Sequence, residues 1–209
     1  MTLRSIVGLA GNLTSPSRTR VLVEAVLEAV QRRFDASTSL VDLSVVGPVL
    51  LSAATRGALA RAGEVLLSRI EAADLLVVGT PVYRASYTGA LKHVFDLLHK
   101  DSLAGKPAVL AATGGSALHG LVTEHQLRPL LAFFGAHTVP TSLYATEADF
   151  TAYRIANAAL ARRIERAAAE AATLLALPGG TRPFDAVVLA ADRDAGVAPH
   201  GNARVGGRP

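Results

Sequence analysis

The chain contains no cysteine among its 209 residues. Disulfide bonds, thiolate metal ligands and cysteine nucleophiles are therefore excluded. It also lacks an uninterrupted apolar run of the roughly 18 residues that a membrane-spanning helix needs. The first residues have no charged start, apolar stretch and small-residue cleavage site of the kind that marks a secretion signal. We therefore expect a cytoplasmic protein with no membrane association.

An excess of charge of one sign is also missing. The formal net charge is only +4, and the Lys and Arg residues are scattered rather than clustered. Nucleic-acid-binding proteins typically carry a basic patch or stripe, so we expect no nucleic-acid partner. The mild positive balance does suit an anionic ligand such as a phosphorylated cofactor. Half of the residues are hydrophobic and 18% are charged, which is typical of one compact domain with a substantial core.

The six histidines form no metal-binding pattern. His93 and His99 are six residues apart, as are His119 and His125, so neither pair has the i, i+4 spacing that places two ligands on one helix face. No cluster of Asp or Glu completes a site in the sequence. We therefore expect no metal.

Short apolar segments alternate with helical patterns, which indicates an α/β fold with a parallel sheet. Five β–α units predict a flavodoxin-like three-layer fold with a five-stranded parallel sheet in the order 2-1-3-4-5. We place the domain at residues 1–177 and expect residues 178–209, rich in Gly, Pro and Arg, to form a flexible tail. The expected strands are 4–10, 38–43, 74–79, 106–112 and 137–144; the expected helices are 17–34, 57–72, 87–99, 117–134 and 149–176; and 44–56 is expected to be an apolar loop.

A proline lies inside the expected helix 117–134. Pro129 cannot donate to the carbonyl of His125, and its ring crowds that carbonyl. A π-bulge is one accommodation, and we predict it at His125–Gln126. The alternative is a simple proline kink in which His125 caps a carbonyl.

The segment 8–20 joins the first expected strand to the first expected helix. A helix N-terminus offers unpaired N–H groups and the positive end of the helix dipole, which together bind phosphate. Ser15, Ser17 and Thr19 add hydroxyl donors, and Arg18 adds a charge-assisted contact. The alternative is an ordinary helix cap with Ser17 as N-cap. The segment contains neither a Walker A motif nor G-x-G-x-x-G, which disfavours ATP-binding and dinucleotide-binding folds.

Two further loops follow the third and fourth expected strands. The first is Pro81-Val82-Tyr83-Arg84, in which proline stiffens the chain and the next three residues are expected to offer main-chain N–H groups. The second is Thr113-Gly114-Gly115-Ser116, whose glycines allow the backbone to approach a ring closely and whose hydroxyls can donate. Either loop alone is equally compatible with a plain turn into a helix.

Taken together, the three loops favour a ligand site. They follow strands one, three and four, which lie side by side at the switch point where such sheets bind ligands. They therefore predict a flavin mononucleotide site. His119, which follows the last loop, is expected at the ring edge, although a solvated histidine at a helix start explains it equally well.

The strings Gly-Thr-Pro-Val-Tyr-Arg-Ala-Ser-Tyr-Thr-Gly-Ala-Leu-Lys (79–92) and Ala-Thr-Gly-Gly-Ser (112–116) resemble the NAD(P)H-dependent FMN reductase family. They are most similar to the flavin reductases of two-component alkanesulfonate and methanesulfonate monooxygenases. The resemblance covers about residues 4–176 and implies FMN, a reduced nicotinamide donor (NADPH or NADH) and a homodimer or homotetramer. It also implies a flavin-dependent monooxygenase that receives the reduced FMN.

The resemblance also implies residue roles. Some reductases of this type are similar in having an inserted residue near position 125, at a subunit interface close to the flavin, so the predicted bulge would serve assembly or flavin release. The first loop departs from the usual Gly-Ser-x-Arg opening at Asn12 and Leu13. By the resemblance, Ser15, Ser17 and Arg18 hold the FMN phosphate, Pro81, Val82 and Tyr83 border the ribityl chain and ring, and Thr113, Gly114, Gly115 and Ser116 hold the isoalloxazine.

The chemistry expected from this resemblance needs no acid–base residue, because hydride transfer is the cofactors' own chemistry. Donors from Gly114 to Ser116 would favour the negative charge of reduced flavin, and Arg18, Arg20 or Arg84 would attract the nicotinamide phosphates. One alternative is a quinone, azo or chromate reductase with permanently bound FMN. The other is a flavodoxin-like electron carrier, which the positive net charge disfavours because such carriers are usually strongly acidic.

Overall fold

A computed structural model describes residues 3–177, and the predicted tail 178–209 lies outside the described residues. The strands of the main sheet are β1 (Arg4–Ala10), β2 (Ala36–Asp42), β3 (Leu75–Pro81), β4 (Pro107–Gly114), β5 (His137–Thr138) and β6 (Leu143–Thr146). Their order is β2-β1-β3-β4-β5, all neighbours are parallel, and β6 also pairs with β4. This confirms the predicted flavodoxin-like fold with the order 2-1-3-4-5.

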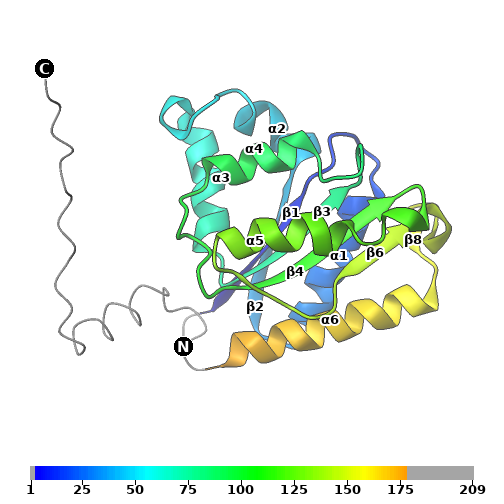
Figure 1. The fold of residues 1–209 in the computed structure, drawn as a ribbon. Coiled ribbons are helices and arrows are strands. Elements are labelled where there is room, and N and C mark those ends of the chain that lie inside the picture. Colours follow the sequence, from blue (N-terminus) through cyan, green and yellow to red (C-terminus); the bar gives the residue numbers. More distant parts are fainter. Residues whose placement is uncertain (1–2, 178–209) are drawn as a thin grey trace, which may run out of the picture.

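Helices cover both faces of the sheet and make three layers (Figure 1). Successive strand residues point to opposite faces, so Ile6 and Ala10 of β1 join one core while Val7 and Leu9 join the other. The first core is closed by α1 (Arg18–Gln31) and α6 (Ala158–Ala176), and the second by α2 (Leu43–Leu50), α3 (Arg61–Ala72), α4 (Gly89–Leu97) and α5 (Arg128–Phe133). In the described part of the chain, no helix is long and apolar enough to cross a membrane.

The prediction of a loop at 44–56 is wrong, because α2 occupies its first half. Asp42 caps this helix by accepting from the Ser44 N–H at 2.9 Å. Gly47 and Pro48 suggest a break, but Pro48 removes only one intrahelical hydrogen bond and the helix continues through it to Leu50.

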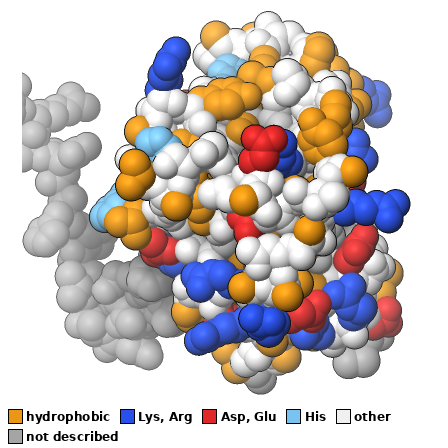
Figure 2. Space-filling view, turned by 90° about the vertical axis from the view of Figure 1, so that its right-hand side faces the viewer, with side chains coloured by type: hydrophobic (Ala, Val, Ile, Leu, Met, Phe, Trp, Pro, Cys, Tyr) orange, Lys and Arg blue, Asp and Glu red, His pale blue; other side chains and the backbone are white. Residues whose placement is uncertain are grey.

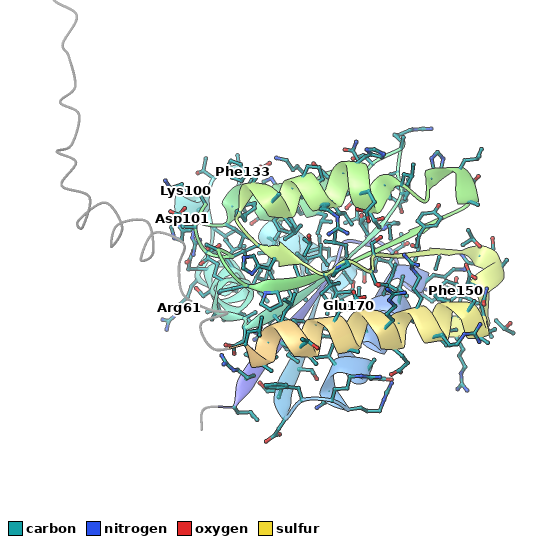
Figure 3. The ribbon with its side chains drawn as sticks, turned by 60° about the horizontal axis from the view of Figure 1, so that its bottom comes forward. Arg61, Lys100, Asp101, Phe133, Phe150 and Glu170 are labelled. Carbon is teal, nitrogen blue, oxygen red and sulfur yellow. The ribbon has the colours of Figure 1, made fainter. Side chains whose placement is uncertain are left out.

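The fifth strand is divided rather than continuous over 137–144. Pro140 lies between β5 and β6 and has no N–H to donate to the ladder with β4. The next residue, Thr141, turns its N–H and hydroxyl to the Glu170 carboxylate on α6, at 2.8 and 2.7 Å; Figure 3 labels Glu170. The Glu170 side chain therefore accepts the hydrogen bond of a backbone N–H that no neighbouring strand accepts.

The last predicted helix, 149–176, is wrong over its first nine residues. A 3-10 turn (η4, Glu147–Asp149) leads there into a small antiparallel hairpin of β7 (Phe150–Thr151) and β8 (Arg154–Ile155). The turn residues between these strands, Ala152 and Tyr153, have φ of 46° and 58°, which a two-residue hairpin turn requires. The helix itself begins after Asn157, whose side chain accepts from the Ala159 N–H at 2.8 Å.

The region predicted as helix 117–134 is built from three pieces. They are a 3-10 turn (η2, Ala117–His119), a π-helical turn (η3, Thr123–Leu127) and α5. The π-bulge predicted at His125–Gln126 is therefore confirmed. The other predicted helices are shorter at their ends, and 57–72 begins as a separate 3-10 turn (η1, Arg56–Ala58) before α3.

An ion-pair cluster ties this first turn to α3. Arg56 contacts Glu64 at 2.5 Å and Glu71 at 2.5 Å, and Glu71 also accepts from the His99 N–H at 2.8 Å. Burial raises the pKa of Glu71, but hydrogen bonds from Arg56 and His99 outweigh it and hold that pKa below its ordinary value.

We expect Arg56→Ala to lower the free energy of unfolding by about 2 kcal/mol at neutral pH, because Glu71 is left partly buried without its partner. A carboxyl whose folded pKa is lowered stabilises the protein above its ordinary pKa and loses that contribution as the pH falls through the lowered value. The difference between wild type and variant should therefore narrow below the ordinary carboxyl pKa of about 4.3. Urea unfolding of both proteins at a series of pH values on either side of this pKa measures the difference in unfolding free energy. A difference that stays constant with pH would contradict a stabilising role for ionised Glu71.

Candidate functional site

A cavity of about 240 Å³ lies at the carboxyl ends of β1, β3, β4 and β6. Figure 2 views the molecule from the side on which β8 and the start of α6 lie in Figure 1, and shows hydrophobic, basic and acidic side chains mixed there. Nine of the thirteen residues predicted for the site line this cavity: Ser17, Arg18, Thr19, Pro81, Val82, Tyr83, Thr113, Gly114 and Gly115. All three predicted loops therefore contribute to it.

The first turn of α1 forms one end of the cavity. Ser17 is the N-cap, and its hydroxyl accepts from the Arg20 N–H at 3.3 Å. The N–H groups of Arg18 and Thr19 form no hydrogen bond with any described residue. Two unpaired donors and the positive end of the helix dipole thus lie at this turn, which suits an anion. The Arg18 side chain lines the same cavity.

A buried hydroxyl pair anchors this turn to the sheet. Thr19 Oγ1 lies 2.6 Å from Thr113 Oγ1, and both side chains are buried. The contact joins the start of α1 to the end of β4. The N–H donors are therefore held in a fixed position relative to the next loop.

Two of the three main-chain donors that the sequence predicts after β3, those of Val82 and Tyr83, are already engaged. The Val82 N–H donates to the Thr113 carbonyl at 2.7 Å, and the Tyr83 N–H donates to Ser86 at 2.9 Å. Arg84 and Ala85 have φ of 51° and 64° and make the tight turn that closes this bridge. Val82 and Tyr83 can thus contact a ligand with their side chains but not with these N–H groups.

The two glycines after β4 play different roles. A Cβ added at Gly114 would overlap the Tyr144 hydroxyl, which donates to the Ser116 carbonyl; burial raises the pKa of Tyr144. A Cβ added at Gly115 would meet nothing within 4 Å. The N–H groups of Gly115 and Ser116 have no partner among residues 3–177. Gly115 therefore presents open backbone with free donors, whereas Gly114 makes room for Tyr144.

Four predicted residues do not line the cavity. Ser15 is exposed within the first loop, and Arg84 is exposed at the tight turn. Ser116 caps the 3-10 turn η2 by accepting from the Leu118 N–H at 3.2 Å. His119 is exposed and lines a separate shallow cavity with Leu121 and His125.

Six lining residues were missed from the sequence. Thr146 ends β6, Glu147 begins the turn η4, and Tyr153 lies in the hairpin turn, where the sequence had predicted a helix. Glu147 forms an ion pair with Arg18, and the Tyr153 ring centroid lies 5.5 Å from the Arg18 guanidinium carbon. Asn12, Thr14 and Pro16 belong to the predicted first loop and complete the lining.

The cavity suits a ligand with an anionic end and a flat end. The anion would meet the N–H groups of Arg18 and Thr19, and the flat part would lie against the open backbone at Gly115. FMN has both features, in its phosphate and its ring system. No group of three or more His, Asp or Glu able to hold a metal ion occurs within the described residues.

The chain is similar to known FMN reductases. The chain is 46% identical to the NADH-dependent FMN reductase SfnE of Pseudomonas putida over 170 residues, 81% of this chain and 91% of that protein. It is 43% identical to an FMN reductase (NADPH) of Pseudomonas aeruginosa over 169 residues, 81% of this chain and 91% of that protein.

A solved structure is similar over most of the chain. The apo form of the NADH:FMN oxidoreductase EMOB matches with a TM-score of 0.76 and 32% identity, covering 86% of this chain and 94% of that one. Residues 4–151 match the family described as NADPH-dependent FMN reductase. The match covers more than half of the chain and all three loops that form the cavity, so the chain belongs to the NADPH-dependent FMN reductase family.

Proposed function

We propose that this protein reduces FMN with NADH or NADPH and binds FMN in the carboxyl-edge cavity. One observation supports this most strongly. The same cavity contains N–H donors without partners at the start of α1 and open backbone at Gly115. When bound, FMN supplies the chemistry by accepting a hydride from the nicotinamide, which leaves as NAD⁺ or NADP⁺.

The residues of the chain bind and orient the flavin. The N–H groups of Arg18 and Thr19, the Ser17 hydroxyl and the Arg18 guanidinium would hold the phosphate. Pro81, Val82 and Tyr83 would border the ribityl chain and ring through their side chains. The N–H groups of Gly115 and Ser116 would donate to the ring and favour the negative charge that it gains on reduction.

The proposed product is reduced FMN that leaves the protein for a flavin-dependent monooxygenase. The loops that line the cavity resemble those of the reductase components of two-component monooxygenases, which supports this role. The use of nicotinamide and flavin cofactors agrees with a cytoplasmic protein. The two relatives described above are named for different donors, NADH and NADPH, so both donors belong in the test.

The test is the steady-state oxidation of NADH and NADPH by the purified protein in air, with and without added FMN. We expect oxidation that rises with added FMN and saturates, which makes the flavin a substrate. Oxidation that ignores added FMN but requires a quinone would point to a reductase with permanently bound flavin. No oxidation with either donor would contradict the proposal.

We further propose that the surface around η2 and η3 is an interface between copies of this chain in a homodimer or homotetramer. Leu118 and Leu121 are 91% and 63% exposed there, beside the shallow cavity that His125 lines. Phe133, labelled in Figure 3, is also exposed, but it lies at the far end of α5, away from η2. Exposed apolar side chains grouped in this way commonly mark protein interfaces.

We expect Leu121→Asp to shift the protein to a smaller species, because it places a charge in the proposed interface. Sedimentation velocity of wild type and variant measures the change. Val65→Asp, at an exposed position on α3, is the matched control and should leave the species unchanged. An unchanged sedimentation coefficient for Leu121→Asp, or a monomeric wild type, would contradict the proposal.

A further inference from the structure

The carboxyl-edge cavity is lined, within residues 3–177, by one cation and one anion. They are Arg18 and Glu147, and they form an ion pair with each other. Arg18 opens α1, whereas Glu147 follows β6, so the pair joins two loops that are 129 residues apart in the sequence. The positive charge available to an anionic ligand is therefore already engaged by a carboxylate of the same cavity.

The segment that carries Glu147 is held in place at both of its ends. The Asp149 carboxylate accepts from the Thr146 N–H at 2.7 Å and from the Thr146 hydroxyl at 3.0 Å, which closes a capping box around the turn. The same carboxylate accepts from the Asn157 side chain at 2.6 Å. Glu147 is thus presented by a braced turn rather than by a free loop.

Arg18 is held against the same segment by a second contact. The Tyr153 ring from the β7–β8 hairpin lies 5.5 Å from its guanidinium carbon, within the range of a cation–π interaction. The two contacts draw the guanidinium toward η4 and the hairpin, while the N–H groups of Arg18 and Thr19 lie at the start of α1. In the proposed function, the guanidinium and these N–H groups would hold the flavin phosphate together.

We propose that Glu147 sets the affinity for the flavin phosphate by competing with it for Arg18. This inference rests on the proposed function and deepens it. An apparent affinity falls in proportion to the fraction of protein whose binding group is free, so the ion pair weakens FMN binding. The carboxylate also repels a phosphate placed beside it. Riboflavin has the ring and ribityl chain but no phosphate, so neither the competition nor the repulsion should change its affinity.

This competition gives the ion pair a role in the release of reduced flavin. Each time FMN leaves, Glu147 replaces the phosphate as the partner of Arg18, so the guanidinium is not left without a counter-charge. A reductase that delivers flavin to another protein needs this moderate affinity, whereas a protein with permanently bound flavin does not.

The test compares wild type with Glu147→Gln, which removes the charge and keeps the shape of the side chain. Quenching of flavin fluorescence gives the Kd for FMN and, separately, for riboflavin. Because the pair is exposed, we expect Glu147→Gln to tighten FMN binding about 3- to 10-fold at low salt, and less at high salt. The Kd for riboflavin should not change.

Glu165→Gln is the matched control. Glu165 pairs with Arg32 and Arg33 at the other end of α1, at 2.6 and 2.5 Å, so this variant removes the same charge from an arginine contact away from the cavity. It should leave both Kd values unchanged. In an Arg18→Ala background, the effect of Glu147→Gln should shrink, because the group for which it competes is gone.

The outcomes separate this inference from the proposed function. If wild type binds FMN and Glu147→Gln binds it equally or more weakly, competition is overturned and the proposed function stands. Weaker binding of both flavins would assign Glu147 to the ribityl hydroxyls instead, and would also overturn competition. If wild type binds neither flavin, the proposed function fails, and this inference fails with it.

Discussion

Replacing Gly115 with leucine is expected to weaken FMN binding at least about 100-fold, which corresponds to ~2.8 kcal/mol. A Cβ at this position meets no atom within 4 Å, so the new side chain enters the cavity rather than the core. Leucine would then occupy the space that we assign to the flavin ring. The affinity for riboflavin should fall as far as the affinity for FMN, because leucine obstructs the ring and not the phosphate.

The fold should tolerate this change. Gly115 is exposed and its φ lies outside the left-handed region, so leucine fits its backbone, and we expect the free energy of unfolding to change by less than about 0.5 kcal/mol. Gly89→Leu is the matched control, since a Cβ there also meets nothing and Gly89 does not line the cavity. If a folded Gly115→Leu variant bound flavin as wild type does, the flavin ring could not lie beside Gly115 in this cavity.

Replacing Arg18 with alanine is expected to raise the Kd for FMN about 10- to 100-fold, because a hydrogen bond to a charged group is worth about 1.5–3 kcal/mol. The Kd for riboflavin should change little, because riboflavin lacks the phosphate that Arg18 would contact. Titrations of both flavins, followed by fluorescence, measure the two values side by side. The ratio between them isolates the phosphate contact from any general disturbance of the cavity.

Arg32→Ala controls for the loss of one positive charge from α1. Arg32 flanks the far end of the helix, next to Glu165, and does not line the cavity. This variant should bind both flavins like wild type. Equal weakening of FMN and riboflavin by Arg18→Ala would contradict a phosphate contact and would instead assign Arg18 to the ribityl chain or ring.

Much of the fold could be predicted from the sequence because its signals are local. The buried strands, the helical spacing and the proline at 129 lie in short windows, and they yield the sheet order and the π-bulge. Pro140 is also a local signal, and its missing N–H explains why the fifth strand divides. The Gly47-Pro48 pair misled the prediction, because the cap at Asp42 outweighs it.

Other parts of the site depend on contacts that no short window contains. The Val82 N–H donates to the Thr113 carbonyl on the next strand and is therefore not available to a ligand. This contact exists only in the folded sheet, so the sequence around Val82 does not reveal it. The hairpin turn at Ala152 and Tyr153 uses positive φ without Gly or Asn, the residues that usually announce it. For this reason the prediction missed Tyr153, which reaches the cavity only through that hairpin. It also missed Glu147, which lies in the turn η4 between the end of β6 and the hairpin.

The turnover of free FMN is tested by its anaerobic reduction with NADH, and separately with NADPH, with the protein present at a small fraction of the flavin concentration. The loss of the visible flavin absorbance is followed with wild type and with Gly115→Leu. We predict that wild type bleaches the whole FMN pool, far beyond one equivalent of protein, while Gly115→Leu bleaches little of it. Bleaching limited to one equivalent, or equal bleaching by the two proteins, would contradict a reductase that turns over free FMN in this cavity.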